Sequence, residues 1–179
     1  LYSSAASDVY KRQALIWASN NTLQINGRIF ASQVNKSGTA FLNVRADQPQ
    51  FAGTWVVNGG GIQFLTPGAQ GTGPITLAGS RMTDRDNTFA LTEIRYNFNS
   101  GSPDLFTWTG GAITSIDNNR VYGVLATDRL QQIPALHLRT TNAVAGTGQA
   151  GTLIVQVDGF RSTLRTGAVT LHDLSLIHI

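Results

Sequence analysis

The feature that most constrains this chain is a succession of short apolar runs, each broken by glycine, asparagine or proline. The runs are rich in β-branched and aromatic residues, as β-strands are, whereas breaks such as 58–61 (Asn-Gly-Gly-Gly) and 71–74 (Gly-Thr-Gly-Pro) are ones that strands rarely cross. No window repeats apolar residues at helical spacing. We therefore expect an all-β fold, with a tight turn at 26–27 (Asn-Gly). The candidate strands are 22–25, 28–30, 39–44, 54–57, 62–65, 75–77, 89–96, 105–108, 112–116, 121–125, 135–139, 152–157 and 168–171.

Internal repetition narrows the choice among a sandwich, a barrel and a β-solenoid. The heptads 38–44 (Gly-Thr-Ala-Phe-Leu-Asn-Val) and 151–157 (Gly-Thr-Leu-Ile-Val-Gln-Val) align without gaps, and a polar segment, an apolar residue, a glycine and another strand follow each. Their starts lie 113 residues apart (151 − 38), which predicts about five turns of a solenoid with rungs of roughly 20–25 residues. Chance similarity among Gly/Thr/Val-rich strands is the alternative.

The segment 51–65 (Phe-Ala-Gly-Thr-Trp-Val-Val-Asn-Gly-Gly-Gly-Ile-Gln-Phe-Leu), followed by 71–77 (Gly-Thr-Gly-Pro-Ile-Thr-Leu), resembles the autotransporter-associated β-strand repeat. That family's pattern is an aromatic residue, Gly, a Thr/Val strand, Asn-Ala-Gly or similar, a second strand, and Leu-Gly-Thr-Gly-Pro-Val-Thr-Val. Upstream, 36–44 looks like the family's lead-in Lys-x-Gly-x-Gly-x-Leu-x-Leu. The chain departs from the pattern at Gly59, at 69–70 (Ala-Gln for Ala-Leu) and at 39–40 (Thr-Ala for the second Gly).

The resemblance covers about 36–77 well, 152–171 faintly and 81–136 hardly at all. It implies a right-handed parallel β-helix (β-solenoid) fragment from a secreted or surface-exposed bacterial autotransporter passenger associated with the outer membrane. The function it implies is structural or adhesive, without catalysis, and the partners it implies are glycans or cell-surface polymers. A fragment of a β-helical polysaccharide lyase or glycoside hydrolase is the alternative.

The repeat and the corner glycines predict how the strands stack. Strands 39–44, 54–57, 62–65 and 152–157 should pair in parallel stacks, with glycine and asparagine supplying positive φ at the corners. We expect these side chains to point inward: Phe41 or Leu42, Val56 and Ile154. The amides of Asn43, Asn58 and Gln156 are candidates either for ladders between rungs or for solvent exposure.

The two ends share a feature that sets them apart from the rest of the chain. Residues 8–13 (Asp-Val-Tyr-Lys-Arg-Gln) back-translate to GAT GTG TAT AAG AGA CAG, and the reverse complement of that DNA reads as 174–179 (Leu-Ser-Leu-Ile-His-Ile). The element looks like a transposase adapter from sequencing libraries, so we interpret 1–13 and 174–179 as non-native segments that make few contacts. Residues 14–173 would then be a metagenomic solenoid fragment cut at both ends.

Charge and composition exclude several function classes. Without Lys11, Arg12 and Asp8, 11 basic residues face 9 acidic ones, and no run of like charges provides a nucleic-acid footprint. Cysteine is absent, so neither disulfides nor thiolate metal sites can form. No apolar stretch approaches the roughly 18 residues of a membrane span.

Residues able to carry chemistry are few and scattered. The chain has no nucleophile elbow, phosphate loop or dinucleotide fingerprint. His137 and His172 lie on separate predicted elements without ligand spacing, so we expect neither a metal nor a catalytic role for them. The acidic segments 83–87 and 117–120 contain Ca²⁺-ligand types but match no calcium motif, and solvated turns are expected. We thus expect no catalytic, cofactor-binding or metal-binding residues.

An enzyme would need these groups gathered on one face. Asp84, Asp86, Glu93 and Asp117, with Arg85 or Arg95, are the candidates for such a carboxylate–cation site, although nothing in their spacing requires it. Trp55, Trp108 and Tyr96 could form a sugar-stacking platform if exposed, but packing in the core or at corners is the expected role for each.

Overall fold

The computed structural model describes residues 12–66, 68–78, 92–97, 105–107, 111–116, 119–124, 130–133, 135–139, 153–158 and 163–172. Throughout these residues the regular structure is β-strand, as the sequence predicts. The same residues contain no helix with the length and apolar character needed to cross a membrane.

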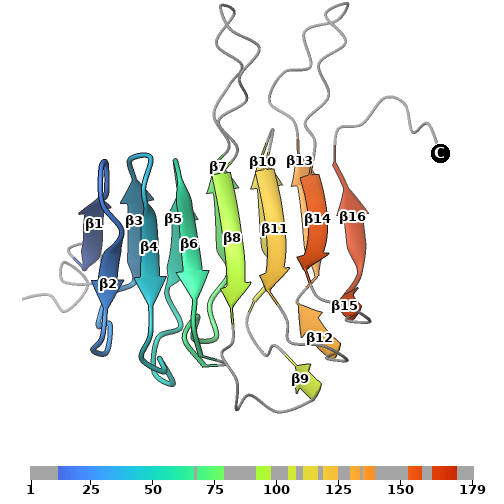
Figure 1. Ribbon diagram of the computed structural model, residues 1–179, viewed down its shortest axis with the longest axis horizontal. Helices are drawn as coiled ribbons and strands as arrows, with labels where there is room; N and C mark the ends of the chain where they lie inside the picture. The colour runs from blue at the N-terminus through green and yellow to red at the C-terminus, as the bar shows by residue number, and fades with distance from the viewer. Residues whose placement is uncertain are drawn as a thin grey trace, which may run out of the picture.

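The strands form three sheets in which every neighbouring pair is parallel (Figure 1). Sheets A and B lie face to face, and the short sheet C lies below them in the C-terminal half in the view of Figure 1. Sheet A consists of β1 (Gln13–Trp17), β3 (Gln33–Ser37), β5 (Thr54–Val57), β7 (Ile75–Ala78), β10 (Ile113–Ile116), β13 (Leu136–Arg139) and β16 (Val169–Leu171). Sheet B consists of β2 (Leu23–Ile25), β4 (Phe41–Val44), β6 (Gly61–Phe64), β8 (Thr92–Asn97), β11 (Asn119–Val124) and β14 (Leu153–Asp158). Sheet C consists of β9 (Leu105–Thr107), β12 (Leu130–Ile133) and β15 (Thr163–Thr166).

The parallel stacking predicted for four strands is confirmed. β4 pairs with β6, β5 pairs with β7 and β14 pairs with β11, each in parallel. The predicted number of turns is wrong, because four strand pairings, not five, separate β4 from β14 in sheet B. The reason is uneven spacing: Trp55 pairs with Ile75, 20 residues on (75 − 55), whereas Ile75 pairs with Ile113, 38 residues on (113 − 75).

Alternation along each strand places the core between sheets A and B. Leu42, predicted to point inward, is buried and stacks on Ile62, whereas Phe41 is half-buried on the outer face. The prediction for Val56 is wrong, since Trp55 and Val57 are the buried residues of β5. Burying such side chains contributes about 1.5–3 kcal/mol each. The inward stack of sheet A comprises Val34, Trp55, Ile75, Ile113 and Leu136.

Ile154 was also expected to point inward, and the register contradicts this. Ile154 pairs with Arg120, whereas its neighbour Val155 pairs with the buried Val121. Ile154 therefore belongs to the outer face of sheet B. β14 is an edge strand of its sheet, and both Ile154 and Val155 are exposed.

Four aromatic side chains form a cluster within the core. The rings of Phe51 and Trp55 meet edge to face at 5.1 Å between centroids, as do those of Trp55 and Phe64 at 5.7 Å, and Phe64 stacks on Tyr96 at 5.9 Å. Gln70 satisfies their polar atoms: its backbone oxygen accepts from Trp55 Nε1 at 2.8 Å, and its Oε1 accepts from the Tyr96 hydroxyl at 3.3 Å. Burial raises the pKa of Tyr96 far above its ordinary range. Trp55 and Tyr96 are thus core residues, and Trp108 lies outside the described residues.

Glycines at the corners adopt the predicted positive φ. Gly38, Gly60 and Gly71 have φ of 84°, 60° and 80°. At Gly60 a second constraint applies, because a Cβ atom would lie 2.6 Å from the backbone oxygens of Thr39 and Ala40 in the rung below. Glycine therefore allows both the turn and the close stacking of successive corners.

The expected strand at 28–30 is not formed. In place of backbone hydrogen bonds to a neighbouring strand, this segment is bound by the Gln48 side chain. Gln48 Oε1 accepts from Ile29 N at 2.7 Å, and its Nε2 donates to Gly27 O at 2.9 Å. Gly27 is not among the glycines with positive φ, so the described conformation lacks the primed hairpin turn that Asn-Gly favours. Four strands of the structure, β1, β3, β12 and β15, are not among the strands that the sequence predicts.

The expectation of few contacts at the N-terminal segment is wrong for its last two residues. Gln13 begins β1 and pairs with Gln33, and the backbone oxygen of Arg12 accepts from Ser32 N at 3.0 Å. Backbone pairing depends little on side-chain identity, so the edge strand β1 can begin at Gln13 whatever the origin of that segment. Residues 1–11 and 174–179 lie outside the described residues.

Candidate functional site

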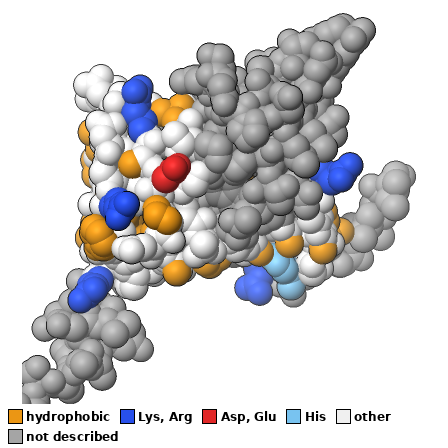
Figure 2. Space-filling view, turned by 90° about the horizontal axis from the view of Figure 1, so that it is seen from below, with side chains coloured by type: hydrophobic (Ala, Val, Ile, Leu, Met, Phe, Trp, Pro, Cys, Tyr) orange, Lys and Arg blue, Asp and Glu red, His pale blue; other side chains and the backbone are white. Residues whose placement is uncertain are grey.

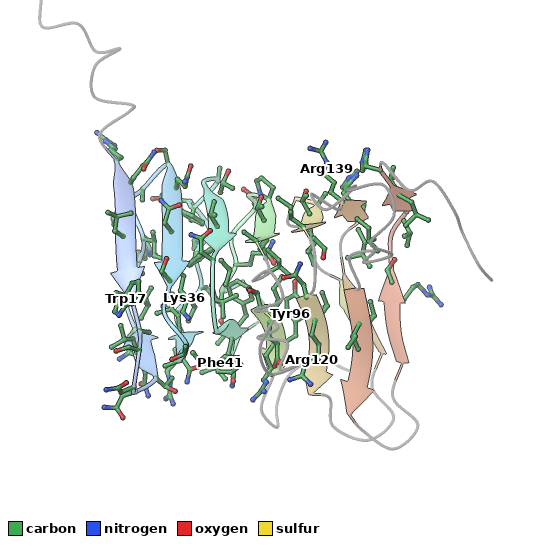
Figure 3. All side chains as sticks on the ribbon, turned by 90° about the horizontal axis from the view of Figure 1, so that it is seen from above. Trp17, Lys36, Phe41, Tyr96, Arg120 and Arg139 are labelled. Atoms are coloured by element: carbon green, nitrogen blue, oxygen red, sulfur yellow. The ribbon has the colours of Figure 1, made fainter. Side chains whose placement is uncertain are left out.

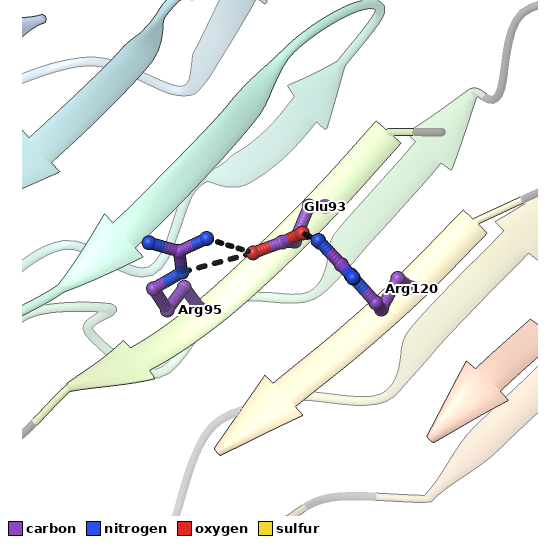
Figure 4. Close-up of polar contacts among 3 residues, drawn as sticks. All are labelled: Glu93, Arg95 and Arg120. Atoms are coloured by element: carbon purple, nitrogen blue, oxygen red, sulfur yellow. Dashed lines mark hydrogen bonds and ion pairs between the residues drawn. The ribbon is translucent and has the colours of Figure 1, made fainter. Parts of the chain in front are cut away.

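A group of charged side chains lies on the outer face of sheet B, centred on Glu93 of β8 (Figure 4). The Glu93 side chain is only 5% exposed. Arg95 approaches Oε1 with Nε at 2.9 Å and Nη2 at 2.8 Å. Arg120 of β11 donates to Oε2 from Nε at 2.6 Å and also from Nη2. Two guanidinium groups therefore hold one carboxylate from both sides.

The strand pattern explains why these residues meet. In β8, Ile94 and Tyr96 are buried, so Glu93 and Arg95 share the opposite, outer face. The parallel register then pairs Glu93 with Arg120 on the next strand. Glu93 and Arg95 are among the candidates that the sequence offers, whereas Arg120 becomes a neighbour only through that register. The expectation of a solvated turn at 117–120 is wrong for Asn119 and Arg120, because β11 begins at Asn119, which is fully buried, and Arg120 pairs with Glu93.

Phe41 of β4 extends the group across sheet B. The Arg95 guanidinium lies over the Phe41 ring with 4.6 Å between Cζ and the ring centroid, a cation–π geometry. Gly61, the register partner of both Phe41 and Glu93, makes room for the ring, because a Cβ atom there would lie 2.3 Å from Phe41 Cε1. Figure 3 shows Phe41 and Arg120 on the same outer side of the sheet.

The geometry of Glu93 suits a brace between strands better than acid–base chemistry. Both carboxylate oxygens accept charge-assisted hydrogen bonds, and the two guanidinium groups screen them from solvent. A general base or a nucleophile needs an oxygen that a substrate proton or carbon can reach. The arginines are 30% and 33% exposed, so the surface that solvent meets is cationic.

The other carboxylates proposed from the sequence cannot be placed. Asp84, Asp86 and Asp117, together with Arg85, lie outside the described residues. Within the parts of the chain that the structure describes, no three His, Cys, Asp or Glu side chains gather in a group able to hold a metal ion.

Lys36 is a buried charge that the sequence does not predict. Lys36 lies between sheets A and B (Figure 3) and is fully buried. Its Nζ donates to the backbone oxygens of Gly38 at 2.8 Å, Gly59 at 2.7 Å and Ala40. Burial lowers the pKa of Lys36 from its ordinary 10.5 to about 8. Since the three oxygens belong to two successive corners, Lys36 ties one rung to the next.

Asn43 and Asn58, the two ladder candidates whose side chains the structure describes, do not form inward ladders. Asn43 lies on the outer face beside Gln24 and Gln63, and its buried Oδ1 has no hydrogen-bond partner among the described residues. Asn58 is exposed, and the side chain of Gln156 is outside the described part of the structure. A different amide, Asn119, is fully buried and donates to Ser115 Oγ at 2.8 Å.

His137 and His172, for which the sequence shows no ligand spacing, are neighbours in the structure. His137 Nδ1 and His172 Nε2 are 3.4 Å apart, and their ring centroids are 5.6 Å apart. Both rings are half-buried. The two residues do lie on separate elements, as expected, but the pairing of β13 with β16 brings His172, which directly follows β16, beside His137 across 35 residues of sequence.

Comparison with known proteins gives no match: no family model, no curated protein and no solved structure is similar to this chain.

Proposed function

We propose that this chain is a segment of a right-handed parallel β-helix and serves as a non-catalytic structural or adhesive module of a secreted or surface-exposed bacterial passenger of the autotransporter type. The observation that carries the proposal is the parallel, in-register stacking of strands in sheets A and B. Stacking of this kind extends by adding rungs, each of which buries its apolar residues against its neighbours. Corner glycines and interstrand braces such as Lys36 support the same interpretation.

Adhesion would use the outer faces of the sheets. The outer face of sheet B presents Gln24, Asn43 and Gln63 in one row, and the cationic surface around Arg95 and Arg120 lies beside them. Amide and guanidinium groups hydrogen-bond hydroxyls and carboxylates, which are the polar groups of glycans. Glycans or other cell-surface polymers are therefore the proposed partners.

The competing proposal is a fragment of a polysaccharide-active β-helix enzyme. The observation that favours it is the contact of Glu93 with two arginines on an outer face, since lyases and glycosidases need carboxylates and cations together. Against it stands the saturation of both Glu93 oxygens.

The test is turnover of acidic and neutral polysaccharides by the purified chain, with and without Ca²⁺. Lyase products are followed by the absorbance of the new double bond, and hydrolase products by reducing ends. We expect no turnover. Turnover abolished by Glu93→Gln, Asp84→Ala or Asp86→Ala, but kept by Asp47→Ala, would overturn the proposal and favour the enzyme; Asp47 is a suitable control because it is exposed and accepts a hydrogen bond only from Thr66 among the contacts described.

A further inference from the structure

Two histidines lie side by side on the outer face of sheet A, His137 within β13 and His172 directly after β16. β13 and β16 pair in parallel with His137 opposite Thr170, so His172 lies two residues further along the neighbouring strand. The backbone nitrogen of His172 donates to Leu138 O at 2.9 Å, which fixes the position of this residue just after β16. Leu136 is buried, so alternation places the His137 side chain on the solvent side. Figure 2 shows histidine side chains on the surface beside a basic side chain.

The separation of the two ring nitrogens matches the spacing of metal ligands. His137 Nδ1 and His172 Nε2 are 3.4 Å apart. In a tetrahedral zinc site with Zn–N bonds of about 2.0–2.1 Å, two nitrogen ligands lie about 3.3–3.4 Å from each other. The rings are inclined by 30° rather than stacked flat, and both are half-buried. A metal ion would therefore find two imidazoles already placed at its ligand spacing.

We propose that His137 and His172 together chelate one divalent transition-metal ion of the Zn²⁺, Cu²⁺ or Ni²⁺ class, through Nδ1 of His137 and Nε2 of His172. Imidazole nitrogens suit these borderline ions, whereas Mg²⁺ and Ca²⁺ prefer oxygen. Water or an external ligand completes the coordination, since no further His, Cys, Asp or Glu joins the pair among the described residues. The sequence predicts no metal role for these residues because their spacing matches no ligand motif, whereas the pairing of β13 with β16 supplies the proximity that the spacing lacks.

Arg139 provides a second, independent test of the proposed metal site. It ends β13 two residues after His137, is exposed, and points outward on the sheet A side in Figure 3. Its positive charge on the same face opposes a bound cation, so Arg139→Ala should strengthen metal binding. A hydrogen bond between the two rings, without any metal function, would not respond in this way.

The experiment is a titration of the full, tag-free chain with Cu²⁺, followed by electron paramagnetic resonance and calorimetry, with Zn²⁺ and Ca²⁺ in parallel. We expect one ion per chain and a spectrum with two coordinating nitrogens. Loss of a residue that merely orients a metal ligand already costs about 10–100-fold in affinity, so removing one of the two ligands with His137→Ala or His172→Ala should weaken binding by about tenfold or more and leave one nitrogen in the spectrum. Ca²⁺ should not bind at this site.

His178→Ala is the matched control, because it removes the third histidine of the chain and should leave binding unchanged. If His137→Ala fails to fold, His172→Gln provides the same test at the end of the strand. The proposal is overturned if both variants bind Cu²⁺ as tightly as the wild type, if His178→Ala abolishes binding, or if the wild type binds no ion at millimolar concentration.

Discussion

Glu93→Gln tests whether the charged group on sheet B acts as a structural brace. The substitution preserves shape but replaces one oxygen with an NH₂ group, so one arginine loses its acceptor and faces another donor. Breaking a buried ion pair costs about 3–5 kcal/mol, whereas exposed pairs contribute about 0–1 kcal/mol. Because Glu93 is buried and its two arginines are 30% and 33% exposed, we expect an intermediate loss of about 2–3 kcal/mol.

The measurement is urea unfolding followed by circular dichroism, with thermal melting alongside. In a chain of this size about 1 kcal/mol corresponds to a shift of about 2–4 °C, so the melting temperature should fall by about 4–12 °C. Asp47→Asn is the matched control, since this exposed carboxylate accepts one hydrogen bond from Thr66 at 2.7 Å, and it should cost no more than about 0.5 kcal/mol.

A double-mutant cycle assigns the loss to the contact itself. Arg120→Gln alone should cost less than Glu93→Gln, because the carboxylate keeps Arg95 as a partner. The double variant should then be less destabilised than the sum of the single ones, by about 1 kcal/mol or more. Additive effects, or a Glu93→Gln variant as stable as the Asp47→Asn control, would refute the brace.

Two further predictions concern buried groups. Trp55→Phe removes the hydrogen bond from Nε1 to Gln70 O and should cost about 1–3 kcal/mol in urea unfolding. Trp55→Ala also leaves a cavity in the core and should cost about 3–5 kcal/mol. Equal losses for the two variants would contradict the separate contributions of the hydrogen bond and of core packing. Burial lowers the pKa of Lys36 to about 8, so between about pH 8 and 10.5 the unfolded chain binds more protons than the folded one. The free energy of unfolding of the wild type, compared with that of Lys36→Met, should therefore rise with pH in this window, by up to about 1.4 kcal/mol per pH unit. Tyr96, whose pKa is raised, lowers the stability of both proteins above about pH 10, so its effect cancels when the two free energies of unfolding are subtracted. If that difference between the wild type and Lys36→Met did not change with pH, Lys36 would not titrate as proposed.

The sequence predicted what depends on local chemistry. Glycine, asparagine and proline mark where each short strand must end, and positive φ at Gly38 and Gly60 follows from that role. The sequence leaves open whether Phe41 or Leu42 points inward. The structure shows that Leu42 does, because it is buried and stacks on Ile62. These features need no knowledge of how long each rung is.

The sequence could not predict what depends on register. In 54–57 three apolar residues follow Thr54, so alternation does not decide which of them is inside; the stacking of Trp55 between Val34 and Ile75 decides it. β3 was missed because its buried positions hold Val34 and a lysine, a pattern that is not recognisable as a strand with an apolar face.

The same dependence on register governs where function can arise in this fold. Glu93 meets Arg120 across 27 residues and His137 meets His172 across 35, so neither pair forms a local motif. Each pair persists if a loop between strands changes length, because the pairing of strands, not the number of residues between them, sets the contact. A shift of one residue within β11 or β16 would instead turn Arg120 or His172 toward the opposite face, since side chains alternate along a strand. A functional site on the outer face of such a chain therefore tolerates insertions at the corners but not insertions within strands. Its residues are recognised from the pairing of neighbouring strands and not from their spacing in the sequence.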